Sequence, residues 1–161
     1  MKLTEDMKRV VQEQALGFVA TVCPDGTPNL SPKGTTTVWD DDHLIFADLA
    51  SPGTMRNLRA NPAVEINVID PIARRGYRFK GRAEVVTEGP LFERAMGFYE
   101  GQLVGARERA RGFVIVTVER AHALKSPAYD LGRTEDEIVE QWERHYARLG
   151  ARRRGDADVR T

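Results

Sequence analysis

The chain has 161 residues, of which 41 % are hydrophobic and 30 % charged, a composition that fits one soluble globular domain with a real core. Its 24 basic and 24 acidic residues balance, which removes the long-range electrostatic reason to expect a nucleic-acid partner. No apolar run approaches the ~20 residues that span a bilayer, the N-terminal segment "MKLTEDMKRV" has no apolar signal core, and the single cysteine excludes an internal disulfide, so we expect a cytoplasmic protein.

The first third of the chain predicts one helix followed by strands. Thr4 is a good cap for a helix over residues 4–15, with acidic residues in its first turn. β-Branched and aromatic residues then predict strands in "GFVATV", in residues 28–39 and in "HLIFAD", with Asp-Gly at the centre of the "PDGT" turn. We therefore predict a three-strand meander over residues 17–48.

The rest of the chain alternates short helices with strands. Ser51 as N-cap and Pro52 as first helical residue predict a helix that stops at Asn61-Pro62. Strand character returns in "AVEINVID", "GYRFKGRAEVVTE" and "GFVIVTVERAHAL", with the short helix "PLFERAMGFYEGQL" before the last of these. About six strands with short connections indicate a small closed or partly closed barrel rather than a doubly wound fold.

The C-terminal region predicts one helix and a tail. Thr134 and Glu137 form a capping box for a helix ending near Leu149, and its apolar stripe must cover either the barrel or a partner chain. Residues 1–150 are therefore expected to form one domain with N- and C-terminal helices. The polar segment 151–161 lacks periodicity, and we expect it to be disordered.

An interrupted strand, "NLSPKGTTTVW", is the first candidate site. Alternation places Asn29, Ser31 and Lys33 on one polar face, which an ordinary solvent-facing strand would also show. That explanation leaves Pro32 and Gly34 unaccounted for, because both weaken a strand interior. Together they free the backbone from regular pairing at one spot, where a flat ligand could lie.

The "SPGT" corner is the second candidate. A helix N-terminus offers unpaired amides and partial positive charge, and so binds phosphate readily. Ser51 and Thr54 add hydroxyl groups, Gly53 permits close approach, and Lys33 could reach in from the neighbouring strand. Ordinary capping by Ser51 explains the same residues without a ligand.

The "DPIARRGYRF" segment is the third candidate. Arg74 and Arg75 could clamp a phosphate or line an exposed loop, and Tyr77 could stack on a ring or pack in the sheet. The three histidines show no metal-ligand spacing with one another or with Cys23, so no metal site is predicted. Cys23 is expected to be a small buried thiol, and there is no "GxGxxG" or P-loop motif.

The order and spacing of these segments resemble those of the pyridoxamine 5′-phosphate oxidase-like family, the FMN-binding split barrels. The resemblance runs from about Met7 to Leu149 and is carried by "GFVATVCPDGTPNLSPKG", "DDDHLIFADLASPGTMRNLRANPAVEINVID", "YRFKGRAEVV" and "SPAYDLG". It implies a mainly β fold, a six-stranded antiparallel split β-barrel with peripheral helices. It further implies a homodimer with FMN in a cleft touched by both chains.

The resemblance also implies the cofactor-binding residues. They lie in the "SPKG" strand, at the end of the third strand, at the start of the following helix, and in a "RRGY" segment that some members supply from the partner chain: Ser31, Pro32, Lys33, Gly34, Thr35, Ala47, Asp48, Thr54, Asn57, Arg75, Gly76 and Tyr77. In this interpretation Pro32 and Gly34 open the strand to the flavin ring. Lys33 places positive charge near the phosphate or the reducible ring.

The chain departs from the true vitamin oxidases in two places. Gly53-Thr54 stands where they carry an Arg-Lys pair for the FMN phosphate, and their C-terminal strand with its substrate motif has no counterpart. We therefore expect a protein that is not a true pyridoxamine phosphate oxidase. Three functions remain open: an FMN-dependent oxidoreductase of unknown substrate, a deazaflavin-dependent reductase, and a non-catalytic flavin-binding or storage protein.

Overall fold

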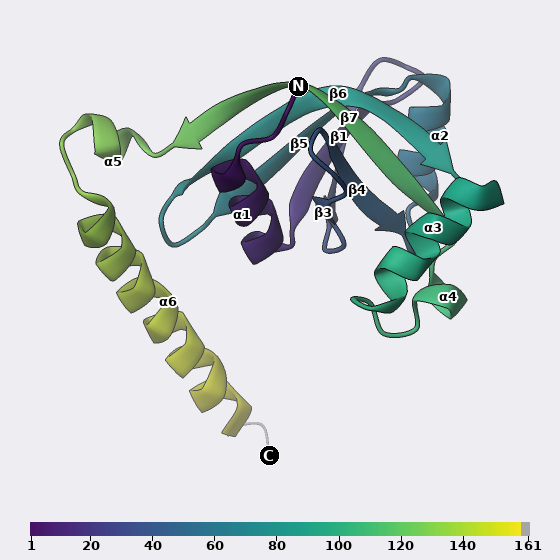
Figure 1. The fold of residues 1–161 in the computed structure, drawn as a ribbon. Helices are drawn as coiled ribbons and strands as arrows, with labels where there is room; N and C mark the ends of the chain where they lie inside the picture. Colours follow the sequence, from purple (N-terminus) through teal and green to yellow (C-terminus); the bar gives the residue numbers. More distant parts are fainter. Residues whose placement is uncertain (159–161) are drawn as a thin grey trace.

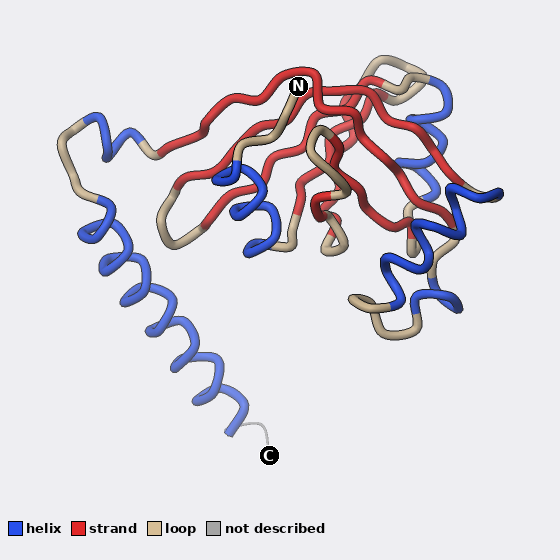
Figure 2. The backbone as a smooth tube through the Cα atoms, viewed as in Figure 1, coloured by secondary structure: helices blue, strands red, loops and turns tan. Residues whose placement is uncertain are grey.

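The computed structural model describes the backbone of residues 1–158 and the side chains of residues 1–151. Seven strands form one antiparallel sheet in the order β2-β1-β5-β6-β7-β4-β3, which curls into a half-barrel with helices at its periphery (Figures 1 and 2). The strands are β1 (Gly17–Val22), β2 (Pro28–Lys33), β3 (Thr37–Val38), β4 (His43–Asp48), β5 (Ala63–Asp70), β6 (Arg75–Val86) and β7 (Gly112–Lys125). The helices are α1 (Glu5–Gln14), α2 (Pro52–Ala60), α3 (Gly89–Glu100), α4 (Ala106–Arg109), α5 (Pro127–Asp130) and α6 (Glu135–Asp158). The predicted split-barrel fold is confirmed, with seven strands instead of six.

The additional strand arises because the predicted strand over residues 28–39 is divided. β2 ends at Lys33 and β3 begins at Thr37, and these two strands are the opposite edges of the sheet. Residues 34–36, which we call the edge link, carry the chain from one edge to the other. An extended chain advances at most ~3.6 Å per residue, so the four steps from Lys33 to Thr37 span at most about 14 Å, and the sheet has to curl until its edges lie that close.

The predicted three-strand meander is only half right. β1 and β2 pair antiparallel around the Asp-Gly turn, but β4 pairs with β7 and β3 instead of with β2. The reason lies in the composition of β4, whose residues 44–48 are all buried. A strand buried on both faces needs a neighbour on each side and cover above and below, and the interior of the sheet provides both.

Two apolar clusters fill the structure. The larger lies on the concave side of the sheet under α1, whose cap is formed as predicted when the Thr4 hydroxyl accepts a hydrogen bond from the Met7 amide. The smaller lies between α3 and the outer part of β4 and β7, where the Tyr99 ring stacks on Phe113 with 5.3 Å between centroids. α3 is therefore part of the core and is placed beside the edge link by its packing.

α6 begins as predicted and ends later than predicted. The capping box is present, since the Thr134 amide donates to Glu137 and the Glu137 amide donates to the Thr134 hydroxyl. The helix then continues through residues 151–158, where we expected a disordered tail; residues 159–161 lie outside the described part of the chain. Arginine and alanine are good helix formers, which explains the continuation past Leu149.

Only the first half of α6 is held by the domain, and the helix then runs away from the sheet (Figure 1). Ile138 is buried, and the Arg74 guanidinium lies 3.3 Å from the Trp142 ring centroid. Tyr146 is 41 % exposed, so the apolar stripe is covered at its start and open further along. Among the described residues, no helix is long and apolar enough to cross a membrane.

Gly76 provides a test of how closely β5 and β6 approach. A Cβ atom at this position would lie 2.0 Å from the Val68 carbonyl oxygen, so Gly76→Ala is expected to lower the free energy of unfolding by about 1–3 kcal/mol. The control is Gly97→Ala in α3, where a Cβ atom meets nothing within 4 Å and alanine favours the helix. Urea denaturation of both variants measures the difference, and equal stabilities would contradict the close approach.

Candidate functional site

Lys33, the last residue of β2, is a buried cation. Its side chain is 5 % exposed, and its ammonium donates hydrogen bonds to the hydroxyls of Ser31 and Ser51, the latter at 2.8 Å. Burial lowers the pKa of Lys33, and the nearby Asp48 carboxylate opposes this shift without forming an ion pair with it. A buried ammonium held only by hydroxyls is costly, and an anionic ligand would offset the cost.

The N-terminus of α2 adjoins this ammonium. The Ser51 amide donates to Asp48 Oδ1 at 2.8 Å. Ser51 occupies the N-cap position as predicted, but its hydroxyl makes no capping hydrogen bond. That hydroxyl accepts from Lys33 instead, which confirms that Lys33 reaches in from the strand. The first turn contains no acidic residue, and a Cβ atom on Gly53 would meet nothing within 4 Å. The helix therefore presents its positive end to open space beside a buried cation.

Asn57 and Thr54, both predicted to bind the cofactor, are buried in α2. The Asn57 side-chain amide donates to the Thr21 hydroxyl at 3.0 Å and to Cys23 Sγ at 3.5 Å. Thr21 also accepts from the Asn29 amide at 3.2 Å. In this structure Asn57 therefore fixes α2 against β1 and the residue that follows it, and Thr21 links this group to β2, which keeps the helix N-terminus next to Lys33.

The edge link is fixed from both sides. The Thr35 hydroxyl accepts from the Ala47 amide at 3.0 Å and donates to the Ala47 carbonyl at 3.3 Å, which attaches the link to β4. The buried Thr36 hydroxyl donates to the Lys33 carbonyl at 2.9 Å. Thr36 fits because Gly17 lacks a side chain, since a Cβ atom there would lie 2.6 Å from the Thr36 hydroxyl. Gly34 is exposed with open space around it, so its backbone can be approached closely.

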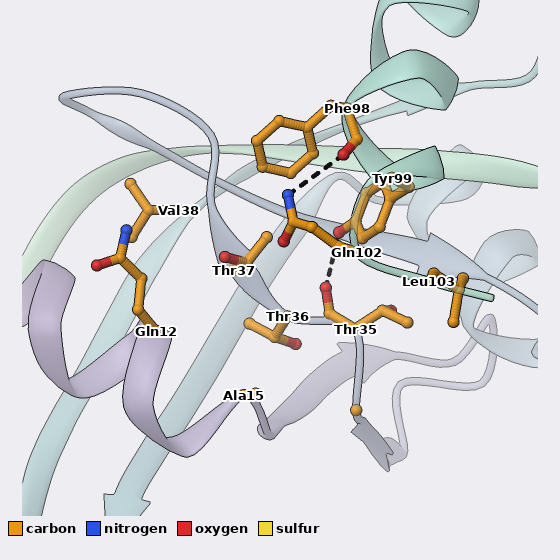
Figure 3. A pocket seen from close by; sticks show the side chains of 11 residues that line it. Gln12, Ala15, Thr35, Thr36, Thr37, Val38, Phe98, Tyr99, Gln102 and Leu103 are labelled. Carbon is orange, nitrogen blue, oxygen red and sulfur yellow. Dashed lines mark hydrogen bonds between the residues drawn. The ribbon is translucent and has the colours of Figure 1, made fainter. Parts of the chain in front are cut away.

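A cavity of about 350 Å³ lies between the edge link, α1 and the C-terminal end of α3 (Figure 3). The Tyr99 hydroxyl donates to the Thr35 carbonyl at 2.7 Å and so fixes one wall, and burial raises the pKa of this phenol. Phe98 of α3 and Gln102, in the turn after α3, face the same space. Sequence reasoning missed these residues, because an aromatic pair at a helix end looks the same whether it packs in a core or lines a site.

The third predicted part of the site, Arg75, Gly76 and Tyr77, lies away from Lys33 in the folded chain. In the order β2-β1-β5-β6 they are three inter-strand steps from Lys33, about 14 Å at the usual strand spacing. Arg75 pairs with Glu135 at 3.1 Å, the Tyr77 hydroxyl donates to Asp6, and both residues line a separate cavity of about 250 Å³. One chain therefore does not bring the two predicted halves of the site together, and their meeting across two chains stays a prediction.

The histidine of the 40–43 turn lies next to two carboxylates that sequence spacing did not indicate. His43 Nδ1 is 2.7 Å from Asp40 Oδ1 and 2.9 Å from Asp42 Oδ1. The same Asp40 oxygen accepts from the Asp42 and His43 amides. These hydrogen bonds account for the clustering of Asp40, Asp42 and His43, because together they stabilise a tight turn.

Comparison with known proteins relates this geometry to a family. A family model described as "Pyridoxamine 5'-phosphate oxidase" matches residues 3–125. HupZ from Group A Streptococcus is 35 % identical with a TM-score of 0.69, covering 77 % of this chain and 95 % of that one. A structure described as "F420 Reductase" is 28 % identical with a TM-score of 0.57, covering 74 % and 98 %.

A more distant structure shares the fold. An FMN-binding protein from Syntrophomonas wolfei subsp. wolfei has a TM-score of 0.63 at 14 % identity, covering 76 % of this chain and 86 % of that one. The family match spans every strand and the first four helices, including the edge link and the start of α2. The chain therefore belongs to the pyridoxamine 5′-phosphate oxidase family.

Proposed function

We propose that this protein binds FMN between two copies of the chain and acts as a flavin-dependent oxidoreductase. The observation that carries the proposal is the buried Lys33 ammonium, which forms no salt bridge among the described residues and lies at the start of α2 beside the open backbone of Gly34. The family and the structural likeness to the FMN-binding protein from Syntrophomonas wolfei subsp. wolfei support the same cofactor.

The residues present fit a flavin phosphate. The ammonium of Lys33, the Ser31 and Ser51 hydroxyls and the free amides of the first turn of α2 supply donors around one point. Gly53 leaves the approach open. This set takes the place of the Arg-Lys pair whose absence the sequence revealed. The Lys33 ammonium would offset the negative charge of the phosphate, and the two serine hydroxyls would orient it.

The backbone of the edge link fits the polar edge of a flat ring. Gly34 lets a ring approach, while Tyr99 and Ala47 hold Thr35 in place from two directions. Bound flavin would supply electron transfer, and the chain would bind it, orient it and limit its access to water. Preorganisation of the link lowers the entropy lost on binding.

A second cofactor is favoured by one specific observation, the 28 % identity to a structure described as an F420 reductase. A deazaflavin shares the phosphate and the flat tricyclic ring, so the Lys33 site fits both. Titration of the purified protein with FMN and with F420, followed by absorbance and fluorescence, separates the two. Binding of FMN alone would remove the deazaflavin alternative.

Catalysis and storage are separated by turnover. A storage protein would hold flavin that no reduced nicotinamide or dithiol can reduce, even with electron acceptors present. An oxidoreductase would show reduction of the bound flavin and its reoxidation by an acceptor. Stopped-flow absorbance of the flavin-loaded protein measures both half-reactions.

The proposed dimer would use the outer face of β1 and β2. Three of its apolar side chains are well exposed, Phe18 at 40 %, Val22 at 37 % and Leu30 at 64 %. The strand register places all three on the same side of the two strands, away from Val19 and Thr21, which are buried. A second copy of the chain covering this face would remove a contiguous apolar surface from water.

The first prediction concerns Lys33. Lys33→Met is expected to weaken FMN binding about 10- to 100-fold, because a hydrogen bond to a charged group contributes ~1.5–3 kcal/mol. Lys2→Met, at an exposed position, is the control for lost charge. Flavin fluorescence titration measures both affinities, and unchanged binding by Lys33→Met would contradict the phosphate role.

The second prediction concerns pH. Because burial lowers the pKa of Lys33, raising the pH toward the ordinary lysine value of 10.5 removes its proton earlier than on an exposed lysine. The affinity for FMN should therefore fall relative to that for riboflavin, which has no phosphate. The ratio of the two dissociation constants across this pH range is the measurement, and a constant ratio would contradict a charged Lys33 at the phosphate.

The third prediction concerns assembly. The protein is expected to be a dimer at micromolar concentration, and Leu30→Asp should give monomers because it places a charge in the apolar contact. Val104→Asp, at a residue 91 % exposed on the loop between α3 and α4, should remain dimeric. Sedimentation velocity compares the three proteins, and a monomeric unmodified protein would refute the dimer.

A further inference from the structure

The cavity beside the edge link has an unusual lining for this chain. Although 30 % of the residues are charged, the eleven residues around the cavity include no Asp, Glu, Lys, Arg or His. Six of them carry the argument: Gln12, Thr35, Thr37, Phe98, Tyr99 and Gln102. The lining is therefore polar and aromatic but neutral.

The polar groups of the lining differ in availability. Tyr99 is committed to the Thr35 carbonyl, and Gln102 donates to the Phe98 carbonyl at 3.2 Å through its amide nitrogen. That leaves the Gln102 amide oxygen, the Gln12 amide on α1 and the Thr37 hydroxyl as groups for a ligand, placed around the same space (Figure 3). They could bind carbonyl or hydroxyl groups at the edge of a ligand.

The aromatic part of the lining is also held in place. The Phe98 ring meets the Trp39 ring edge-on with 5.2 Å between centroids. Trp39 is itself in contact with Arg94, whose guanidinium lies 4.9 Å from the Trp39 ring centroid. A ring in the cavity would thus find a supported aromatic surface. The volume of about 350 Å³ is within the usual range for sites that bind small molecules.

A charged ligand does not fit this lining. A carboxylate or phosphate in the cavity would give up part of its hydration and find no cationic side chain in the lining to offset that cost. The Lys33 ammonium is not part of the lining. Phosphorylated substrates are therefore disfavoured at this position, whereas a neutral ring loses little on entry.

We infer that this cavity is the second-substrate site, and that it selects an uncharged planar molecule with carbonyl or hydroxyl groups at its edge. The inference rests on the proposed function, because it places the substrate next to the backbone that would hold the flavin ring. The edge link then separates two binding regions of opposite character, a cationic one at Lys33 and a neutral one at Gln12 and Gln102.

The experiment compares two probes of similar shape, coumarin and coumarin-3-carboxylate. Isothermal titration calorimetry on the flavin-loaded protein is expected to show that coumarin binds at least about tenfold more tightly than its carboxylate. Equal affinities, or no binding of coumarin, would overturn the inference. Loss of coumarin binding when FMN saturates the protein would also overturn it, because the cavity would then belong to the flavin.

A charge variant tests the cause of the selectivity. Gln12→Lys introduces a cation at the cavity and should improve binding of the carboxylate about tenfold or more, with little change for coumarin. Gln14→Lys, two residues further along α1 and outside the lining, should leave both affinities unchanged. No gain for Gln12→Lys, or an equal gain for Gln14→Lys, would contradict the assignment.

Failure of the proposed function would be visible separately. Flavin loading is measured first by absorbance, and the same titrations are run on protein without flavin. Protein that takes up no flavin but prefers coumarin as expected would refute the flavin proposal and leave the neutral cavity as a binding site. Protein that binds flavin without preferring coumarin would refute the cavity assignment alone.

Discussion

The structure depends on the three residues that connect the two edges of the sheet. Because β2 and β3 are neighbours in sequence and opposite edges in space, residues 34–36 force the sheet to curl into a half-barrel. The link is fixed to β4 through Thr35 and to α3 through Tyr99. Its backbone is exposed at Gly34 because neither edge strand continues there. The opening of the barrel and the candidate site are therefore one feature.

The link also organises charge. On one side Lys33 is buried against two serines and the N-terminus of α2, so that region favours an anion. On the other side the cavity under α3 is lined only by neutral groups. A ligand with a phosphate at one end and a flat ring at the other could satisfy the first region and lie along the link. The second region would then remain for an uncharged partner.

Local signals predicted most elements. The Thr4 cap, the Asp-Gly turn and the capping box at Thr134 act over three or four residues, and each is present in the structure. Gly34 correctly marked the end of a regular strand, but Pro32 does not interrupt it, because Pro32 lies inside the edge strand β2 and pairs in register with Phe18. Strand number and short connections already indicated a barrel, but family resemblance was needed for its split form, because the hydrophobic pattern of a strand does not specify its partner.

The misses share a physical cause. The partner of β4, the engagement of the Ser51 hydroxyl by Lys33 and the approach of α3 to the link depend on contacts between distant segments. Ser51 has the composition of a cap, but a buried ammonium competes for its hydroxyl. The length of α6 was missed for another reason, since a polar helix without an apolar repeat looks like a tail. FMN, the dimer and the residues contacting the cofactor remain predictions.

The pairing of β4 with β7 has a consequence for synthesis on the ribosome. Leu44 pairs with Val116, so the partner strand of β4 emerges some seventy residues after β4 itself. Until then the side chains of Leu44, Ile45 and Phe46, fully buried in the finished protein, lack their cover. Nascent chains therefore expose an apolar strand for as long as this stretch takes to synthesise, and a chaperone bound to the first hundred residues would cover that strand during the interval. Slow, non-local pairing is thus the kinetic counterpart of a sheet whose last strand joins β4 to β6.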